Sequence, residues 1–489
     1  MKPRATRSPT ALKRALDDAD LGPLHWRIWI LSALGIFLDG FDLFVIGIAA
    51  PLIAEDFHAS PFMIGVVTGA GVLGAVVGAF LGGRLTDLLG RKAIYLMDLA
   101  CFILFTLGSM GAWSLWSLAI FRFLLGVGIG ADYPICAAYV AETVPSRHRG
   151  RMLVAAFSFQ AVGALAAAGV GVLVLKLDPS PGAWRWILGA GAVPALAILI
   201  LRVKVPESPR WSMEHGRLEE ASRVVEQLIP RDRLDDLERL VATGQARIER
   251  VHERQLGLTH LFESGFRRRT ILASVPWFLM DVATYGVGLF TPLILQGMLF
   301  ARGGTHDDNL AGSFMERNLL SVETTAFVSL FLLAGFGLNL LLVERAGRLR
   351  LQAVGFAGMA AGLLLLAAGE WGAGPQGSPP MPLVLGGFVL FNLLMNAGPN
   401  ATTFILPAEL YPTRLRATGH GFAASCGKAG AALGSVALPV GVARMGTATT
   451  LALVAGACAL GMLVTMLSGV ETTRQSLEDL EPTDVGVEP

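Results

Sequence analysis

Hydrophobic residues in this chain are grouped in long blocks, separated by shorter segments that are charged or contain Gly and Pro. A helix of about twenty apolar residues is long enough to cross a hydrocarbon layer of ~30 Å. About twelve such runs follow one another, near residues 26–54, 62–84, 92–113, 115–140, 151–176, 184–204, 270–299, 321–344, 350–369, 381–406, 417–443 and 446–469. The pattern predicts an all-α membrane protein with twelve transmembrane helices.

Residues 205–269 interrupt this pattern with a charged segment. It contains "GRLEEASRVVEQL", whose apolar spacing predicts a short amphipathic helix at the membrane surface. Six runs precede the segment and six follow it. The expected organisation is a cytoplasmic N-terminus, a six-helix bundle, a cytoplasmic linker, a second six-helix bundle and a cytoplasmic tail, at 1–25, 26–204, 205–269, 270–470 and 471–489.

Composition agrees with a membrane protein, because 53% of the 489 residues are hydrophobic and only 16% are charged. The four cysteines, Cys101, Cys136, Cys426 and Cys458, fall inside predicted spans, where they are interpreted as small buried side chains. No disulfide, metal site or cofactor is expected. The net charge of +1 gives no indication of nucleic-acid binding, and a monomer without a nucleic-acid partner is expected.

Lys and Arg gather at the N-terminus, after the second, fourth, eighth and tenth runs, and through 204–269, whereas loops 55–60 and 111–114 contain none. By the positive-inside rule both termini are expected to be cytoplasmic. The N-terminus lacks an early apolar core and a small-residue cleavage site, so no cleavable signal peptide is expected.

The two halves of the chain repeat each other. "AETVPSRHRG" aligns with "AELYPTRLRA", which matches Glu142 with Glu409, Pro145 with Pro412, Arg147 with Arg414 and Arg149 with Arg416. A weaker match joins "GGRLTDLLGRK" to "LVERAGRLR". Repetition at the scale of a six-helix half is typical of secondary transporters, whose substrate site lies near the membrane midplane between the halves.

"GGRLTDLLGRK" resembles the loop motif of the major facilitator superfamily, with Asp87, Arg91 and Lys92 in the expected places. "RFLLGVGIGADYP" and "PESPRW" resemble its sugar-porter-like branch. The resemblance implies two pseudo-symmetric six-helix bundles around a central cavity, working by alternating access. The glycines in "GVGIG" have two interpretations, a phosphate-binding loop or close helix packing; their apolar span without a preceding strand favours packing.

The charged loops suggest a gate. Opposite charges at one end of the helices can pair when that end is closed and separate when it opens; surface pairs of this kind contribute only ~0–1 kcal/mol each. The candidate gating residues are Asp87, Arg91, Lys92, Glu142, Arg147, Arg149, Glu409, Arg414 and Arg416. The alternative is that these charges only set the topology.

Six ionisable residues lie within predicted spans: Asp39, Asp42, Arg122, Asp132, Asp281 and Lys428. Each costs about 2.5–3.5 kcal/mol to insert, so such residues usually face a cavity or a partner. Asp39 and Asp42 share one helix face, where two carboxylates cannot both ionise cheaply. This predicts a proton-coupling site, which Asp132 and Arg122 are expected to complete; a structural ion pair is the alternative for each member.

Trp277, Asp281 and Tyr285 repeat every four residues and therefore lie along one helix face, just after a helix break expected at Pro276. The face is either an apolar stripe with an incidental aspartate or the polar wall of a cavity. Other spans supply Tyr133, Gln160, Asn400 and Lys428. One cation, several neutral donors and one acceptor carboxylate suit dihydrogen phosphate, whereas fully ionised sulfate would be repelled by Asp281.

"PWFLMDVATYG", "GADYP", "FQAVGA", "GPNATTFILPAELYPTRLRATGHG" and "SCGKAGA" together resemble the phosphate:proton symporter family. That resemblance implies phosphate contacts from Tyr133, Gln160, Trp277, Asp281, Tyr285, Asn400 and Lys428. It also implies that Asp39, Asp42, Asp132 and Arg122 handle protons.

One motif departs from this family. "DGFD" replaces the expected D-x-Y-D and is similar to the motif of aromatic-acid:proton symporters, while the Gly- and Ala-rich composition resembles that of bacterial proteins. The function expected is therefore phosphate import with protons across a plasma (bacterial inner) membrane, without enzymatic chemistry. Symport of an aromatic or other small organic acid stays open, as does a ligand-binding transceptor that carries nothing.

Overall fold

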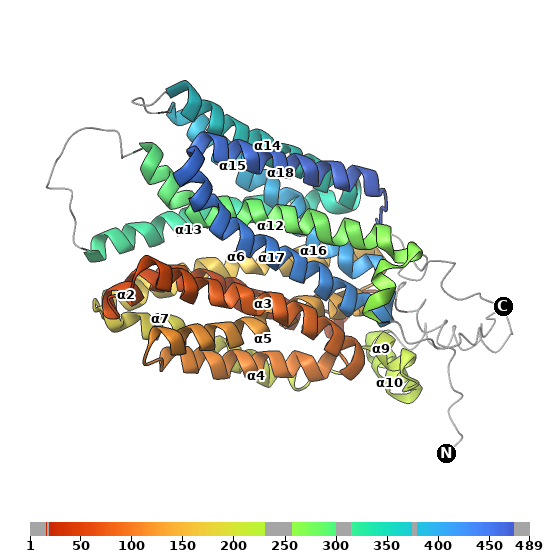
Figure 1. The fold of residues 1–489 in the computed structure, drawn as a ribbon. Coiled ribbons are helices and arrows are strands. Elements are labelled where there is room, and N and C mark those ends of the chain that lie inside the picture. Colours follow the sequence, from red (N-terminus) through yellow and green to blue (C-terminus); the bar gives the residue numbers. More distant parts are fainter. Residues whose placement is uncertain (1–15, 17–18, 230–256, 300–313, 374–378, 474–489) are drawn as a thin grey trace, which may run out of the picture.

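The computed structural model describes residue 16 and residues 19–229, 257–299, 314–373 and 379–473. Its regular elements are all helices in these ranges, and the long ones lie side by side in one elongated bundle (Figure 1). Eleven helices of the described residues are long and apolar enough to cross a membrane. The predicted all-α membrane fold is confirmed.

The first half of the chain forms one side of the bundle. Its helices are α2 (Pro23–Asp56), α3 (Pro61–Leu89), α4 (Arg91–Met110), α5 (Leu115–Thr143), α6 (Ser146–Leu177), α7 (Trp184–Gly189) and α8 (Ala192–Arg202). The run predicted at 184–204 is therefore two helices rather than one. Two short helices follow, α9 (Pro209–Glu214) and α10 (Leu218–Leu228). The apolar face of α10 is buried, as its amphipathic sequence predicts.

The second half forms the other side. Its helices are α12 (Ser264–Leu299), α13 (Phe314–Ala346), α14 (Arg348–Ala373), α15 (Met381–Ala397), α16 (Pro399–Leu410), α17 (Thr413–Met445) and α18 (Thr447–Ser468). The run predicted at 321–344 lies within α13. The run predicted at 381–406 is divided at Gly398, because Pro399 has no N–H with which to continue α15.

One expected feature of α12 is wrong. We expected a break at Pro276, yet α12 continues through this residue from Ser264 to Leu299. A proline inside a membrane helix is tolerated when neighbouring groups satisfy the freed backbone carbonyl. The continuity of α12 keeps Trp277, Asp281 and Tyr285 on one face.

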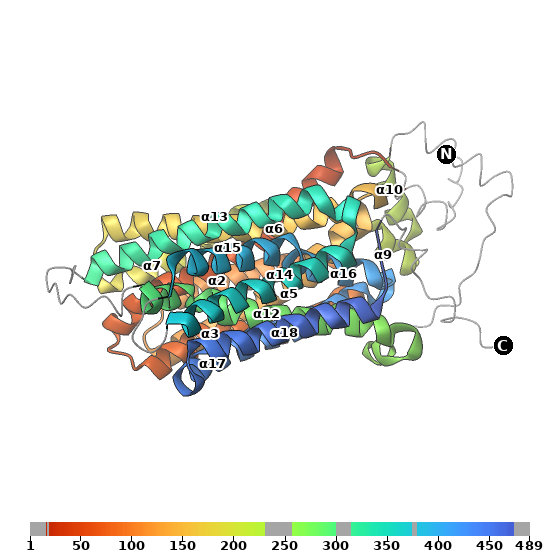
Figure 2. The same cartoon turned by 90° about the horizontal axis from the view of Figure 1, so that it is seen from above.

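The two halves meet along the pairs α3 with α17 and α6 with α13, as the two perpendicular views in Figures 1 and 2 agree. Glycine allows the closest approach. A Cβ added to Gly83 would lie 2.3 Å from the carbonyl oxygen of Ala417, and one added to Gly421 would lie 2.3 Å from that of Ala79. Backbones of the two halves therefore touch directly at this position.

We call the end of the bundle where α2 begins and α18 ends the latch end. Here α4 starts with Arg91, directly after Gly90, which has a φ of 100° that favours glycine. The Arg91 guanidinium pairs with Glu142 at 2.6 Å and with Asp87 at 3.1 Å. Glu207 accepts hydrogen bonds from the backbone N–H groups of Arg91 and Lys92 at the start of α4.

The second half repeats this arrangement. Arg348 follows Gly347 at the start of α14 and pairs with Glu344 and Glu409, each at 3.1 Å. Glu471 accepts from the backbone N–H groups of Arg348 and Leu349. Even the hydroxyls correspond, because Ser208 donates to Glu142 and Thr472 donates to Glu409, both at 2.5 Å. The internal repeat is therefore preserved in three dimensions.

Contacts across the halves close the latch end. Arg416 of α17 pairs with Glu142 at 3.0 Å, and Asp87 accepts hydrogen bonds from the backbone N–H and the hydroxyl of Thr418, both at 2.7 Å. We expected surface pairs, but the side chains of Arg91, Glu142 and Arg416 are fully buried. Burial removes water from these charges, so each depends on its partners far more than a surface pair does.

The remaining predicted gating residues lie around this centre. Arg147 pairs with Asp20 at the surface, and Arg414 lies 3.7 Å from Glu214. Arg149 is buried, whereas Lys92 contributes its backbone N–H to Glu207. These four residues lie near the buried pairs of Arg91, Glu142 and Arg416 and take no part in them.

The glycines of "GVGIG" pack helices together. A Cβ on Gly126 would lie 2.1 Å from the carbonyl oxygen of Gly71, and one on Gly130 would lie 2.2 Å from that of Ala75. Gly128 approaches the carbonyl oxygen of Asp98. The packing interpretation is confirmed.

We call the buried pairs of Glu142 with Arg91 and Arg416 the latch. Replacing Glu142 tests how much the latch contributes to stability. Glu142→Gln leaves the buried guanidiniums of Arg91 and Arg416 without their shared charge, so we expect the free energy of unfolding to fall by about 3–5 kcal/mol. Arg147→Ala, which removes an exposed pair, is the control and is expected to cost less than about 1 kcal/mol. Thermal unfolding in detergent measures both; equal stability of the two variants would contradict the buried latch.

Candidate functional site

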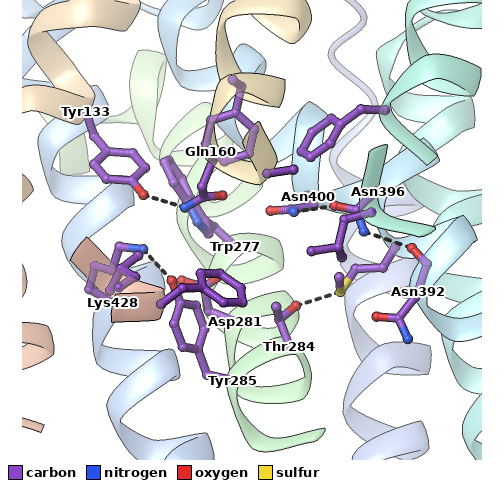
Figure 3. Close-up of a pocket in the computed structure, with 17 residues that line it drawn as sticks. Tyr133, Gln160, Trp277, Asp281, Thr284, Tyr285, Asn392, Asn396, Asn400 and Lys428 are labelled. Atoms are coloured by element: carbon purple, nitrogen blue, oxygen red, sulfur yellow. Dashed lines mark hydrogen bonds between the residues drawn. The ribbon is translucent and has the colours of Figure 1, made fainter. Parts of the chain in front are cut away.

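A cavity of about 130 Å³ lies between the two halves. All seven residues predicted to contact substrate line it, although they come from five helices (Figure 3). Tyr133 is on α5, Gln160 on α6, Trp277, Asp281 and Tyr285 on α12, Asn400 on α16 and Lys428 on α17. The structure therefore brings this whole predicted set together.

Lys428 is the only cationic residue among the described residues that line the cavity. Its side chain is buried, and its Nζ donates to the Tyr285 hydroxyl at 3.0 Å. The same Nζ lies over the rings of Tyr133 and Tyr285, 4.8 and 5.1 Å from their centroids. The aromatic faces stabilise the ammonium without neutralising it, so its charge remains available to an anion.

Asp281 is the one carboxylate among these lining residues. It is 3% exposed, and its Oδ2 has no hydrogen-bond partner in the described structure. No ion pair of 4.0 Å or less joins it to Lys428 among the described residues. An unpartnered buried acceptor is costly, and a ligand that donates a hydrogen would satisfy it.

The neutral polar groups complete the cavity wall. Gln160 donates to the Tyr133 hydroxyl at 2.8 Å, and Asn400 donates to the Asn396 side chain at 2.7 Å (Figure 3). These hydrogen bonds fix the orientation of the amide and hydroxyl groups. Because the residues belong to different helices, donors and acceptors face the cavity from several directions.

An aromatic layer lies beside Trp277. The rings of Phe157 and Phe404 stack across the two halves with centroids 4.4 Å apart, and Trp277 packs edge-on against Phe404 and His420. Tyr133 also contacts both phenylalanines edge-on. Because Phe157 and Phe404 belong to opposite halves, their separation would change whenever the halves move.

The predicted proton-coupling residues divide into two groups. Arg122 pairs with Asp42 at 2.5 Å. Asp132 instead pairs with Arg202 at 3.1 Å and accepts from the Cys136 thiol. We expected Arg122 and Asp132 to complete one relay, and the structure places their charges with different partners.

The group around Asp132 contains two residues that sequence reasoning missed. Arg202 of α8 also pairs with Asp98 of α4 at 3.2 Å, and both side chains are buried. Asp39 lies beside them in a cavity of about 10 Å³, room for about one water molecule, and its Oδ2 has no partner in the described structure. The position of Asp98 inside the predicted span 92–113 was the available signal.

Within the described residues, no group of three His, Cys, Asp or Glu side chains is arranged to hold a metal ion. The cavity presents one cation, one carboxylate with an unpartnered oxygen and several neutral donors, and further buried carboxylates lie nearby.

The model of the family described as sugar (and other) transporter matches residues 28–483. The chain belongs to this family. The match covers both six-helix halves and the charged segment between them, so the predicted membership of the major facilitator superfamily is confirmed.

Three curated plant proteins are similar over most of their length. The "Probable inorganic phosphate transporter 1-10" of Oryza sativa subsp. japonica is 31% identical, with 97% of this chain and 92% of that protein covered. The "Probable inorganic phosphate transporter 1-6" of Arabidopsis thaliana is 31% identical, with 96% of each covered. The "Low affinity inorganic phosphate transporter 8" of Medicago truncatula is 30% identical, with 96% and 92% covered.

Solved structures share the fold. The proton:xylose symporter XylE bound to 6-bromo-6-deoxy-D-glucose superposes with a TM-score of 0.76 at 20% identity, covering 93% of this chain and 98% of XylE. The inward-open conformation of XylE from E. coli gives 0.66 at 19% identity, covering 93% and 99%.

Proposed function

We propose that this protein imports inorganic phosphate together with protons by alternating access. The observation that carries the proposal is that one cavity contains both the Lys428 ammonium and the buried carboxylate of Asp281, whose Oδ2 has no partner in the described structure. Similarity to proteins named inorganic phosphate transporters supports the same substrate.

Dihydrogen phosphate matches this cavity group by group. Its bare oxygens accept from Lys428, from the Tyr285 and Tyr133 hydroxyls and from the amides of Gln160 and Asn400, while the indole N–H of Trp277 is a further donor. Its own O–H donates to Asp281. Sulfate has no hydrogen to donate near neutral pH, so it would leave Asp281 unsatisfied and repelled.

Protons are proposed to use the buried carboxylates of the first half. Arg122 pairs with Asp42 at 2.5 Å and Arg202 pairs with Asp132 at 3.1 Å, so each of these two carboxylates already has a cationic partner. Asp39, whose Oδ2 is unpartnered, is the carboxylate best placed to take up a proton. Protonation of Asp39 would remove one buried charge and so ease the movement of the halves.

The proposed topology follows from the distribution of Lys and Arg. Both termini, the 205–269 linker and the latch end face the cytoplasm of a bacterium, and 26–204 and 270–470 are the two moving bundles. The latch and the Phe157–Phe404 stack then close the cavity toward the cytoplasm in the described conformation. The protein acts as a monomer in the lipid bilayer, without covalent chemistry and without nucleic acid.

Removing the acceptor tests the substrate assignment. Asp281→Asn keeps the size of the side chain and loses its charge, so we expect phosphate uptake into proteoliposomes to fall about ten- to a hundredfold. Sulfate is expected not to inhibit the unchanged protein but to inhibit the residual uptake of the variant. Asp56→Asn, outside the cavity, is the control. Normal phosphate uptake by Asp281→Asn would refute the assignment.

Removing the proton acceptor tests coupling separately. Asp39→Asn imitates a permanently protonated side chain, so we expect phosphate counterflow to continue while accumulation driven by a proton gradient is lost. Both reactions are measured in the same proteoliposomes, with Asp56→Asn as the control. Gradient-driven accumulation at the normal level would remove Asp39 from the coupling mechanism.

A further inference from the structure

The cavity is larger than the ion assigned to it. Its volume of about 130 Å³ is well above the ~10–15 Å³ that a single water molecule needs, and only seven of its seventeen lining residues are assigned to phosphate. Lys428, the cation proposed to bind phosphate, lies on one side of the cavity, where its Nζ faces the rings of Tyr133 and Tyr285. Asn400, which is also assigned to phosphate, lies at the boundary of the remaining space, where it donates to Asn396. The remaining space has a different lining.

We call this remaining side the neutral chamber. Figure 3 shows Thr284, Asn392 and Asn396 across the cavity from Lys428 and Tyr133. The Thr284 hydroxyl contacts the Met395 sulfur at 3.0 Å, and α13, which contributes Leu332 and Phe336, packs against α15. The neutral chamber is therefore lined by Thr284, Leu332, Phe336, Asn392, Met395 and Asn396.

None of these six residues is charged, and their polar groups are already engaged in part. Asn392 donates to the carbonyl of Phe388 at 2.9 Å, and Asn396 donates to that of Asn392 at 2.8 Å. Asn396, Met395 and Phe336 are nearly inaccessible to solvent. An ion that lost its water here would find few groups to replace that water, whereas an uncharged organic group would be stabilised by burial against the apolar side chains.

We propose that the protein also binds and carries small phosphonates and phosphate monoesters, with the phosphorus group at Lys428 and Asp281 and an uncharged organic group in the neutral chamber. This inference rests on the proposed phosphate function. A singly ionised phosphonate keeps oxygens for the donors and one O–H for Asp281, so the organic group replaces only an oxygen that faces the neutral chamber.

Charge sets the limit of this substrate class. Propylphosphonate and 2-aminoethylphosphonate have nearly the same size and shape, but the second ends in an ammonium group. The neutral chamber offers no carboxylate among its lining residues, so the ammonium would be buried without a partner. The two compounds therefore distinguish a chamber that selects by charge from one that selects by size.

The experiment is competition and counterflow in proteoliposomes that contain the full chain. Methyl-, ethyl-, propyl- and 2-aminoethylphosphonate compete with radiolabelled phosphate, and vesicles loaded with propylphosphonate are tested for phosphate counterflow. Inhibition is expected to strengthen about fourfold for each buried methylene. We expect 2-aminoethylphosphonate to inhibit at least about tenfold more weakly than propylphosphonate, and we expect propylphosphonate to support counterflow.

A variant and its matched control locate the effect. Leu332→Trp fills the neutral chamber and is expected to weaken inhibition by propylphosphonate more than it weakens phosphate uptake. Leu330→Trp changes the same helix at a position that is 55% exposed, and is expected to leave inhibition by propylphosphonate as it was.

The outcomes separate the two proposals. Phosphate uptake without inhibition or counterflow by propylphosphonate would overturn the neutral chamber alone, as would equal inhibition by propyl- and 2-aminoethylphosphonate. Absence of phosphate uptake in the unchanged protein would overturn the proposed function itself.

Discussion

The carboxylate of Glu142 connects the parts of the closed bundle. It binds Arg91 of its own half and Arg416 of the other half, and it accepts a hydrogen bond from Ser208 in the segment after α8. All three charged side chains are fully buried, so none can be hydrated when its partner leaves. Opening this end therefore requires water to enter as the pairs separate. Until water enters, each separated charge lacks a partner, which raises the free-energy barrier to opening.

The need of every buried charge for a partner also applies to the interior of the bundle. In the first half, Asp42 pairs with Arg122, and Arg202 pairs with both Asp98 and Asp132. Asp39 and Asp281 differ, because each has an oxygen without a partner among the described residues. A membrane protein keeps such costly groups where they bind something that comes and goes. A proton for Asp39 and a substrate hydroxyl for Asp281 are the occupants proposed above.

Much of the fold and the cavity could be predicted from the sequence, since helical spacing and internal repetition are local properties. The spacing of Trp277, Asp281 and Tyr285 put them on one face, and the match of Glu142 with Glu409 marked equivalent helix ends. The partners of Asp132 could not be predicted in this way, because they depend on how α4, α5 and α8 are rotated against each other. The continuity of α12 at Pro276 likewise depends on neighbouring helices. The break at Gly398 differs, because Pro399 was a local signal for it.

Proton-driven uptake of radiolabelled phosphate into proteoliposomes tests the central claim most directly. An inward proton gradient is imposed or omitted, and arsenate, sulfate and 4-hydroxybenzoate compete. We predict accumulation only with the gradient, inhibition by arsenate and no inhibition by sulfate, because Asp281 requires a ligand that still carries a hydrogen. Uptake of the hydroxybenzoate without uptake of phosphate would contradict the account and assign the cavity to an organic acid.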